Sequence, residues 1–123
     1  MRILVITPWV PYPITGADQQ DRFQGFLQLQ KLGHKIHVIA KIRAFQDRAA
    51  VEHFYQEAGI PLTVLPYLAT PYTLLLSRFF SVLREPALLD GAALEYLDPA
   101  MERAVATAVT GFTPDVAWVD FTF

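Results

Sequence analysis

Residues that can bind a sugar or a phosphate gather in one short segment near the start of the chain. The segment "PWVPYPITGADQQDR" spans residues 8–22 and follows an apolar run. An indole ring stacks on a sugar or a base, amides hydrogen-bond to hydroxyl groups, and a guanidinium binds phosphate. The segment offers these groups as candidate ligand-binding residues in Trp9, Gln19, Gln20 and Arg22.

Each of these residues also has a structural interpretation that the sequence leaves open. An aromatic ring between prolines, as at Trp9, packs locally and stiffens its loop as often as it binds a ligand. Arg22 stands four residues after Asp18, which is the spacing of an ordinary ion pair along a helix. The two glutamines are polar enough to be solvated only. The segment is therefore a candidate site, to be judged by where the fold places it.

Gly16 stands where a helix is predicted to begin. The first turn of a helix presents unpaired backbone N–H groups and a positive dipole end, which suit a phosphate, and a glycine lets the ligand approach closely. Alternatively, Gly16 permits a positive φ in a surface turn, with Thr15 and Asp18 forming a T-x-x-D variant of the capping box. The sequence contains neither G-x-G-x-x-G nor a P-loop.

Asp120 follows the last predicted strand and is the candidate catalytic residue. A carboxylate at the end of a strand acts as a general base toward a hydroxyl group, or it caps the segment that follows. His34, His37 and His53 lack the mutual spacing of metal ligands. We expect them at a helix end, in a strand and on a helix face respectively, and we expect no metal site.

The elements that must position these residues follow from hydrophobic periodicity. The run Arg2–Thr7 is continuously apolar and β-branched, as in a strand covered on both faces. Stripes at helical spacing include Phe23 and Phe26, and later Val51 and Tyr55. The first part of the chain thus reads as strand, helix, strand, helix, strand, at residues 2–7, 17–32, 35–40, 51–58 and 60–65, with Gly33 and Gly59 ending the two helices.

Two proline-opened helices and a strand are predicted beyond this βαβαβ unit. Thr70-Pro71 opens an apolar helix over residues 72–83, which packs in the core or meets a membrane surface. Asp98-Pro99 opens a second helix, which carries an apolar face and ends before Gly111. Residues 115–119 form the fourth strand.

This order of elements predicts one Rossmann-like three-layer α/β/α domain over residues 1–123. Its mainly parallel sheet has the strand order 3-2-1-4. Four residues follow the last predicted strand, from which we expect a truncated domain or pairing with another chain. Ligands of such sheets bind at the carboxyl ends of the strands, where the strand order reverses. We therefore expect a crevice between residues 8–16 and the segment beginning at Asp120.

Composition narrows the function classes. The chain has 123 residues, 53% hydrophobic and 18% charged, with 10 Lys and Arg against 12 Asp and Glu. This balance gives no basic footprint for nucleic acid, and the absence of cysteine excludes disulfides and thiolate chemistry. No secretory signal or membrane span is evident. A cytoplasmic location is expected, with peripheral contact at the inner face of a membrane as the alternative to core packing for residues 72–83.

The stretch "MRILVITPWVPYPITGADQQDRFQGFLQLQKLGHKIHVIA" and, more weakly, "PDVAWVD" resemble the N-terminal domains of GT-B fold glycosyltransferases of family 4. The shared features are an opening strand, a Pro-Tyr-Pro loop, a small-residue turn before a long helix, and a G-H-x-[VI] entry to the second strand. The resemblance implies transfer of a sugar from a nucleotide diphosphate sugar to a polysaccharide, lipid-linked or other acceptor, without a metal cofactor.

The resemblance also implies roles for individual residues. Gly16 and Ala17 match the family's Gly-Gly turn facing the donor, with alanine as the second residue, and Asp120 falls near a position where many members carry histidine. The acceptor side is this N-terminal domain, whereas the family's donor domain is absent from these residues, so we expect no turnover by this fragment alone.

Two other classes of function remain as alternatives. A non-catalytic Rossmann-like binding module would use its unpaired fourth strand and apolar surface for docking or a homodimer. A nucleotide-dependent oxidoreductase would need a glycine-rich fingerprint and an acidic residue after the second strand, where Lys41 and Arg43 stand instead.

Overall fold

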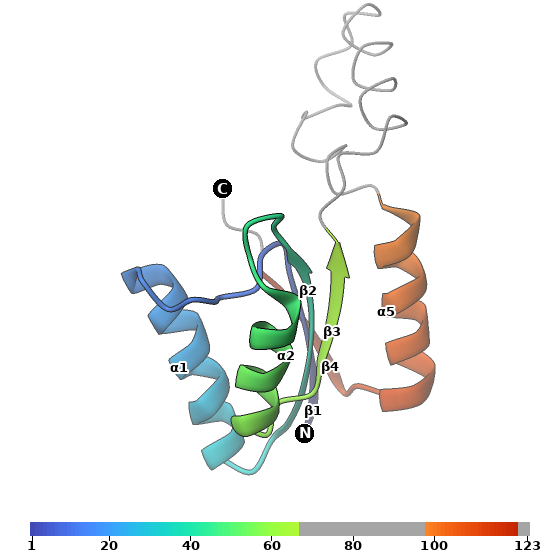
Figure 1. The fold of residues 1–123 in the computed structure, drawn as a ribbon. Coiled ribbons are helices and arrows are strands. Elements are labelled where there is room, and N and C mark those ends of the chain that lie inside the picture. The colour runs from blue at the N-terminus through green and yellow to red at the C-terminus, as the bar shows by residue number, and fades with distance from the viewer. Residues whose placement is uncertain (67–97, 121–123) are drawn as a thin grey trace, which may run out of the picture.

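The computed structural model describes residues 1–66 and 98–120 (Figure 1). Four strands and three helices follow one another as β1 (Arg2–Thr7), α1 (Ala17–Lys31), β2 (Lys35–Ile42), α2 (Arg48–Glu57), β3 (Leu62–Pro66), α5 (Pro99–Phe112) and β4 (Val116–Val119). The four strands pair in parallel in the order β3-β2-β1-β4. This confirms the predicted strand order. The apolar helix predicted over residues 72–83 lies outside the described residues.

The sheet is covered on both faces, which makes three layers. Helices α1 and α2 lie on one face, and α5 lies on the other (Figure 1). Alternate residues of β1 accordingly enter two different cores: Ile3 and Val5 pack beneath α1 and α2, whereas Leu4 packs beneath α5. Burial on both faces explains why β1 is apolar throughout instead of alternating. The predicted three-layer Rossmann-like fold is confirmed.

The predicted glycine stops hold for the first two helices but not for α5. Gly33 has φ 85° and Gly59 has φ 67°, the left-handed conformation that ends a helix. Helix α5 instead continues through Gly111, and the left-handed residue is Thr113 at φ 47°. The extra residues let the ring of Phe112 meet His37 edge-on, with 5.5 Å between ring centroids. The prediction that α5 ends before Gly111 was therefore wrong.

Several other boundaries differ by one or two residues. β2 continues to Ile42 because its pairing with β3 extends that far, with Ile42 opposite Pro66. β3 begins at Leu62, and β4 begins after Asp115, whose carboxylate accepts a hydrogen bond from the backbone N–H of Arg2. None of the helices in the described ranges has the length and hydropathy that crossing a membrane requires.

Candidate functional site

The carboxyl ends of β1 and β4 are joined by a polar contact. Because β4 pairs with β1, the backbone N–H of Asp120 donates to the carbonyl of Ile6 at 2.8 Å. The Asp120 Oδ2 atom lies 3.1 Å from Arg22 Nε and 3.5 Å from the hydroxyl of the buried Thr7. Arg22 thus forms its ion pair with Asp120, and the alternative pair with Asp18 is not the one observed.

Gly16 has an extended backbone at the start of α1. Its φ of −123° and ψ of 160° are open to any residue, so Gly16 does not adopt the positive φ of the alternative interpretation. A Cβ on Gly16 would lie 2.9 Å from Asp18 Oδ1 and 3.4 Å from Gln19 Oε1, so these two side chains would have to move to admit it. Gln19 folds back over this position, and its Oε1 accepts from the backbone N–H groups of Gly16 and Thr15. The predicted Thr15–Asp18 capping box is therefore replaced by a contact from Gln19.

The start of α1 differs from the starts of the other described helices. Asp47 caps α2 by accepting from Ala49 N at 2.9 Å, and Asp98 caps α5 by accepting from Ala100 N at 2.8 Å. Gly16 has no side chain to do this, and within the described ranges no side chain bonds to the N–H groups at positions 17–19. These donors and the positive end of the helix dipole remain available to an anion.

A cavity of about 420 Å³ lies beside this helix start. It is bounded by the loop after β1, the first turns of α1 and the segment that joins β2 to α2. The lining residues are Trp9, Val10, Pro11, Tyr12, Pro13, Thr15, Asp18, Gln19, Arg22, Arg43, Phe45 and Gln46. The cavity therefore lies between the segments that follow β1 and β2. The predicted crevice, between the segments that follow β1 and β4, would lie where the Arg22–Asp120 ion pair is, and residues 121–123 of its second wall lie outside the described residues.

The candidate ligand-binding residues are only partly brought together. Trp9, Gln19 and Arg22 line the cavity, whereas Gln20 is exposed on α1 and does not line it. Gly16 and Ala17 lie next to the lining residues at the start of α1. Asp120 reaches the cavity only through its contact with Arg22.

Sequence reasoning missed the second wall of the cavity, formed by Arg43, Phe45 and Gln46. Arg43 was noted only as a departure from an oxidoreductase pattern. In the structure its guanidinium carbon lies 3.9 Å from the centroid of the Trp9 ring, so at least one face of this indole is covered by a cation. The sequence signal for this wall is a cation beside an aromatic residue directly after a strand, in "IRAF".

Gln46 fixes the two walls relative to each other. Its side-chain amide donates to the backbone carbonyls of Val10 and Tyr12, and its Oε1 accepts from the backbone N–H of Arg43 at 2.8 Å. The backbone N–H of Val10 also donates to the carbonyl of Lys41 at 3.0 Å. These bonds join the loop after β1 to the segment after β2, so the shape of the cavity is established before any ligand enters.

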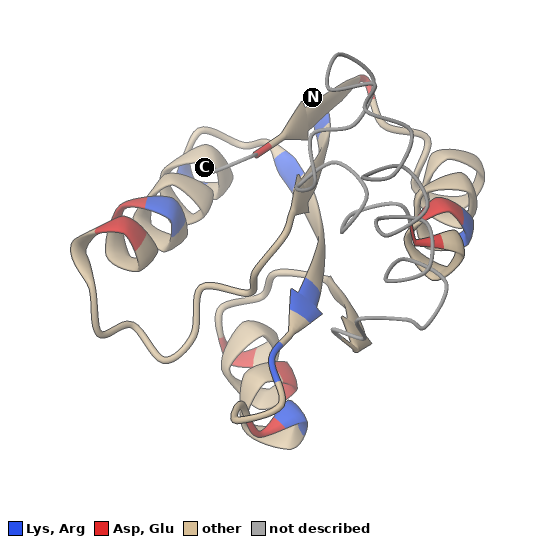
Figure 2. Cartoon of the chain, turned by 90° about the horizontal axis from the view of Figure 1, so that it is seen from above, with Lys and Arg blue, Asp and Glu red and all other residues tan. Residues whose placement is uncertain are grey.

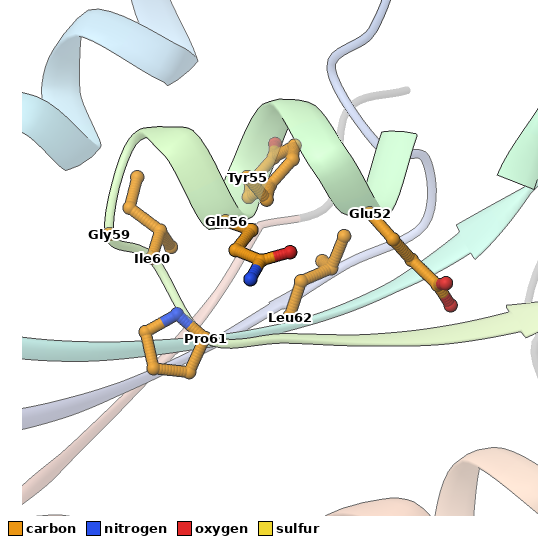
Figure 3. A pocket seen from close by; sticks show the side chains of 7 residues that line it. All are labelled: Glu52, Tyr55, Gln56, Gly59, Ile60, Pro61 and Leu62. Carbon is orange, nitrogen blue, oxygen red and sulfur yellow. The ribbon is translucent and has the colours of Figure 1, made fainter. Parts of the chain in front are cut away.

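Another cavity, of about 440 Å³, lies between α2 and the start of β3 (Figure 3). Figure 3 shows Ile60, Pro61 and Leu62 running from the end of α2 into β3, with Gln56 beside them. Tyr55 also lines this cavity, and burial raises the pKa of its hydroxyl. This lining is largely apolar and brings few polar groups together, so the cavity at Trp9 is the better candidate site.

Acidic and basic positions are interspersed on all three helices seen from above in Figure 2, without the one-sided basic face of a nucleic-acid binder. In the described part of the chain, no group of three His, Asp or Glu residues is arranged to hold a metal ion. His34 follows α1, His37 lies in β2 and His53 lies on α2, as predicted.

Comparison with family models, curated proteins and solved structures finds no match to this chain.

Proposed function

We propose that the chain is the N-terminal, acceptor-side domain of a GT-B glycosyltransferase of the family 4 type. Such an enzyme transfers a sugar from a nucleotide diphosphate sugar to a polysaccharide, lipid-linked or other acceptor. The observation that carries the proposal is the uncapped N-terminus of α1 beside a cavity lined by Trp9, Gln19 and Arg22. A helix start suits the diphosphate, and the aromatic and amide groups suit a sugar.

In this proposal the donor diphosphate approaches the backbone at Gly16 and Ala17, and the acceptor occupies the cavity. Transfer forms a bond between an acceptor hydroxyl oxygen and the anomeric carbon, and it breaks the bond from that carbon to the diphosphate. The hydroxyl proton must leave, and Asp120, which contacts the lining residue Arg22 but does not itself line the cavity, is the candidate to accept it from an acceptor hydroxyl that extends past Arg22. Asp120 Oδ2 is engaged by Arg22 and Thr7, whereas Oδ1 has no hydrogen bond within the described ranges.

The binding half of this proposal is testable on the chain as it stands. UDP-glucose and GDP-mannose are titrated into the ¹⁵N-labelled protein, and we expect the amide signals of residues 16–19 to shift, with the same affinity in EDTA as in Mg²⁺. The substitution Gly16→Asp supplies the carboxylate cap that α2 and α5 have, and it should weaken binding at least about tenfold because it competes with the phosphates.

Gly25→Asp is the matched control because it adds the same charge in the middle of the same helix, where a new Cβ meets nothing within 4 Å. This variant should bind as the unmodified chain does. The proposal fails if neither nucleotide sugar shifts the amides of residues 16–19, or if the two variants lose affinity equally.

A second candidate function, a non-catalytic assembly module, is favoured by β4. This strand pairs only with β1 among the described strands, and Val116, Trp118 and Val119 are exposed on it. Measurement of the molecular mass in solution separates the candidates. A dimer that Val119→Lys dissociates, that Val109→Lys on the exposed face of α5 leaves intact, and that ignores nucleotide sugars would favour assembly.

A further inference from the structure

We propose that the cavity beside Trp9 recognises an anionic group, a carboxylate or a phosphate, on a hydroxyl-bearing sugar, and that Arg43 is the residue that binds it. The site is assigned from its own geometry. Only the description of this sugar as the acceptor rests on the proposed function.

The two arginines of the cavity differ in how their charge is balanced. Arg22 is paired with Asp120 at 3.1 Å. Arg43 forms no ion pair with any carboxylate in the described part of the chain, and none of its side-chain N–H groups has an acceptor there. Arg43 is therefore the cation of this cavity whose charge the described residues leave unneutralised.

Two aromatic rings and Gln46 hold Arg43 in place. Its guanidinium lies 3.9 Å from the centroid of the Trp9 ring and 5.9 Å from that of Phe45. A guanidinium over an indole is held by the face of the ring, and this contact does not use its N–H donors. Gln46 fixes the backbone N–H of Arg43 at the same time. A planar fork held in this way matches the paired oxygens of a carboxylate or phosphate.

The wall formed by α1 carries a negative charge, whereas the wall at Arg43 carries a positive one. Asp18 lines the cavity there, and its carboxylate repels an anion but accepts hydrogen bonds from hydroxyl groups. Gln19 Oε1 is already used by Thr15 and Gly16, so its amide NH₂ is the part left to donate to a ligand oxygen. A ligand with an anionic group at one end and hydroxyls at the other, such as a uronic acid or a sugar phosphate, satisfies both walls.

The experiment follows the fluorescence of Trp9 in a chain made single-tryptophan by Trp118→Phe, which keeps an aromatic ring against Phe26. The probes are glucuronate, glucose 1-phosphate and neutral glucose. We expect a saturable change in Trp9 fluorescence with at least one anionic probe, tenfold or more tighter than with glucose, and weaker binding as NaCl is raised. Whichever anionic probe binds identifies carboxylate or phosphate as the group recognised.

Arg43→Gln should weaken binding of the anionic probe at least tenfold, and Arg43→Lys should fall between the two because an ammonium cannot form the bidentate contact. Arg48→Gln is the matched control: it also removes one exposed arginine, which is paired with Glu52 and lies outside the cavity. Arg43 is exposed, so its variants should unfold at the same urea concentration as the parent chain, which establishes that they are folded.

The inference is overturned if glucose binds as tightly as both anionic probes, if none of the three binds, or if Arg43→Gln and Arg48→Gln have equal effects. None of these readouts involves a nucleotide. Binding of glucuronate or glucose 1-phosphate through Arg43 without any binding of UDP-glucose or GDP-mannose would therefore leave this site standing and remove the proposed transferase function.

Discussion

The two faces of the sheet each place a helix start and an ion pair near the carboxyl ends of the strands. On one face the helix start is capped and joined to the ion pair, and on the other face it is not. On the α5 face, Asp98 caps its helix and pairs with Lys41 Nζ at 3.1 Å. On the α1 face, the helix start at Gly16 has no side-chain cap, and Arg22 pairs with Asp120 beside the cavity. The same kinds of group thus serve a closed arrangement on one face and an open one on the other.

The two ion pairs differ mainly in the burial of the cation. The side chains of Lys41 and Asp98 are 1% and 13% exposed, against 12% and 17% for Arg22 and Asp120. Burial alone would raise the pKa of Asp98, but hydrogen bonds from the backbone of Ala100 and from Lys41 outweigh it and lower that pKa. A covered charge must be compensated in this way. We infer that the α5 pair stabilises the fold, and that the α1 pair holds Arg22 where a ligand can reach it.

The largest expected effect on stability comes from breaking the Lys41–Asp98 ion pair on the α5 face. Lys41→Met should lower the free energy of unfolding by about 3 kcal/mol, because it leaves the covered Asp98 carboxylate without its ammonium partner. Arg22→Met, the matched change in the Arg22–Asp120 pair, should cost less, about 1–2 kcal/mol, because Arg22 is more exposed than Lys41. Urea unfolding of both variants measures the difference.

A double variant separates the charge from the packing of the lysine chain. Lys41→Met combined with Asp98→Asn should recover part of the loss, because asparagine still caps α5 but carries no charge. Equal losses for Lys41→Met and Arg22→Met would show that the two faces do not differ as we infer.

A smaller effect on stability is expected at Tyr55, a buried aromatic residue with a polar hydroxyl. Tyr55, fully buried beneath α1 and α2, has no hydrogen bond to its hydroxyl in the described part of the chain. Tyr55→Phe should therefore raise the free energy of unfolding by about 1 kcal/mol in urea unfolding, since it removes an unsatisfied polar group and keeps the ring. Tyr55→Leu, the control, should lower it through lost packing with Phe23. A loss in Tyr55→Phe would mean that the hydroxyl is bonded, for example to internal water.

The sheet and its helices were predictable because their signals are local. The apolar run Ile3–Leu4–Val5 indicated a strand buried on both faces, Phe23 and Phe26 indicated the covered side of α1, and Gly33 indicated its end. Leu32 shows the limit of periodicity. The predicted helix includes this residue, whereas α1 ends at Lys31 and the Leu32 side chain is exposed.

The candidate site was only half predictable because its geometry depends on long-range contacts. The types of Trp9 and Gln19 suggested binding, but the partner of Arg22 is set by the position of β4, far away in sequence. The wall at Arg43 depends on Gln46 bonding to the loop after β1, which no periodicity encodes. A side chain on Gly16 would first meet the carboxylate of Asp18, a contact set by side-chain position and not by a backbone angle.

The last prediction concerns pH and distinguishes the α5 layer again. His37 Nε2 lies 2.8 Å from the Thr63 hydroxyl beneath α5, and burial lowers the pKa of this histidine below its usual 6.5. The unfolded chain therefore binds a proton at a higher pH than the folded chain does. The stability that His37 contributes is complete above about pH 6.5 and is lost as the pH falls through the lower, folded-state pKa.

Urea unfolding at pH 7.5, 6.0 and 5.0 measures this loss. His37→Gln should flatten the profile over that range, whereas His53→Gln, at an exposed position on α2, should leave it unchanged. The lowered pKa values of Asp98 and Asp115 confine their own contributions to more acidic conditions, so they do not overlap this window. If the free energy of unfolding of His37→Gln depends on pH as steeply as that of the parent chain, the acid-sensitive contact lies elsewhere in the chain. The α5 layer would then not be the source of the pH dependence.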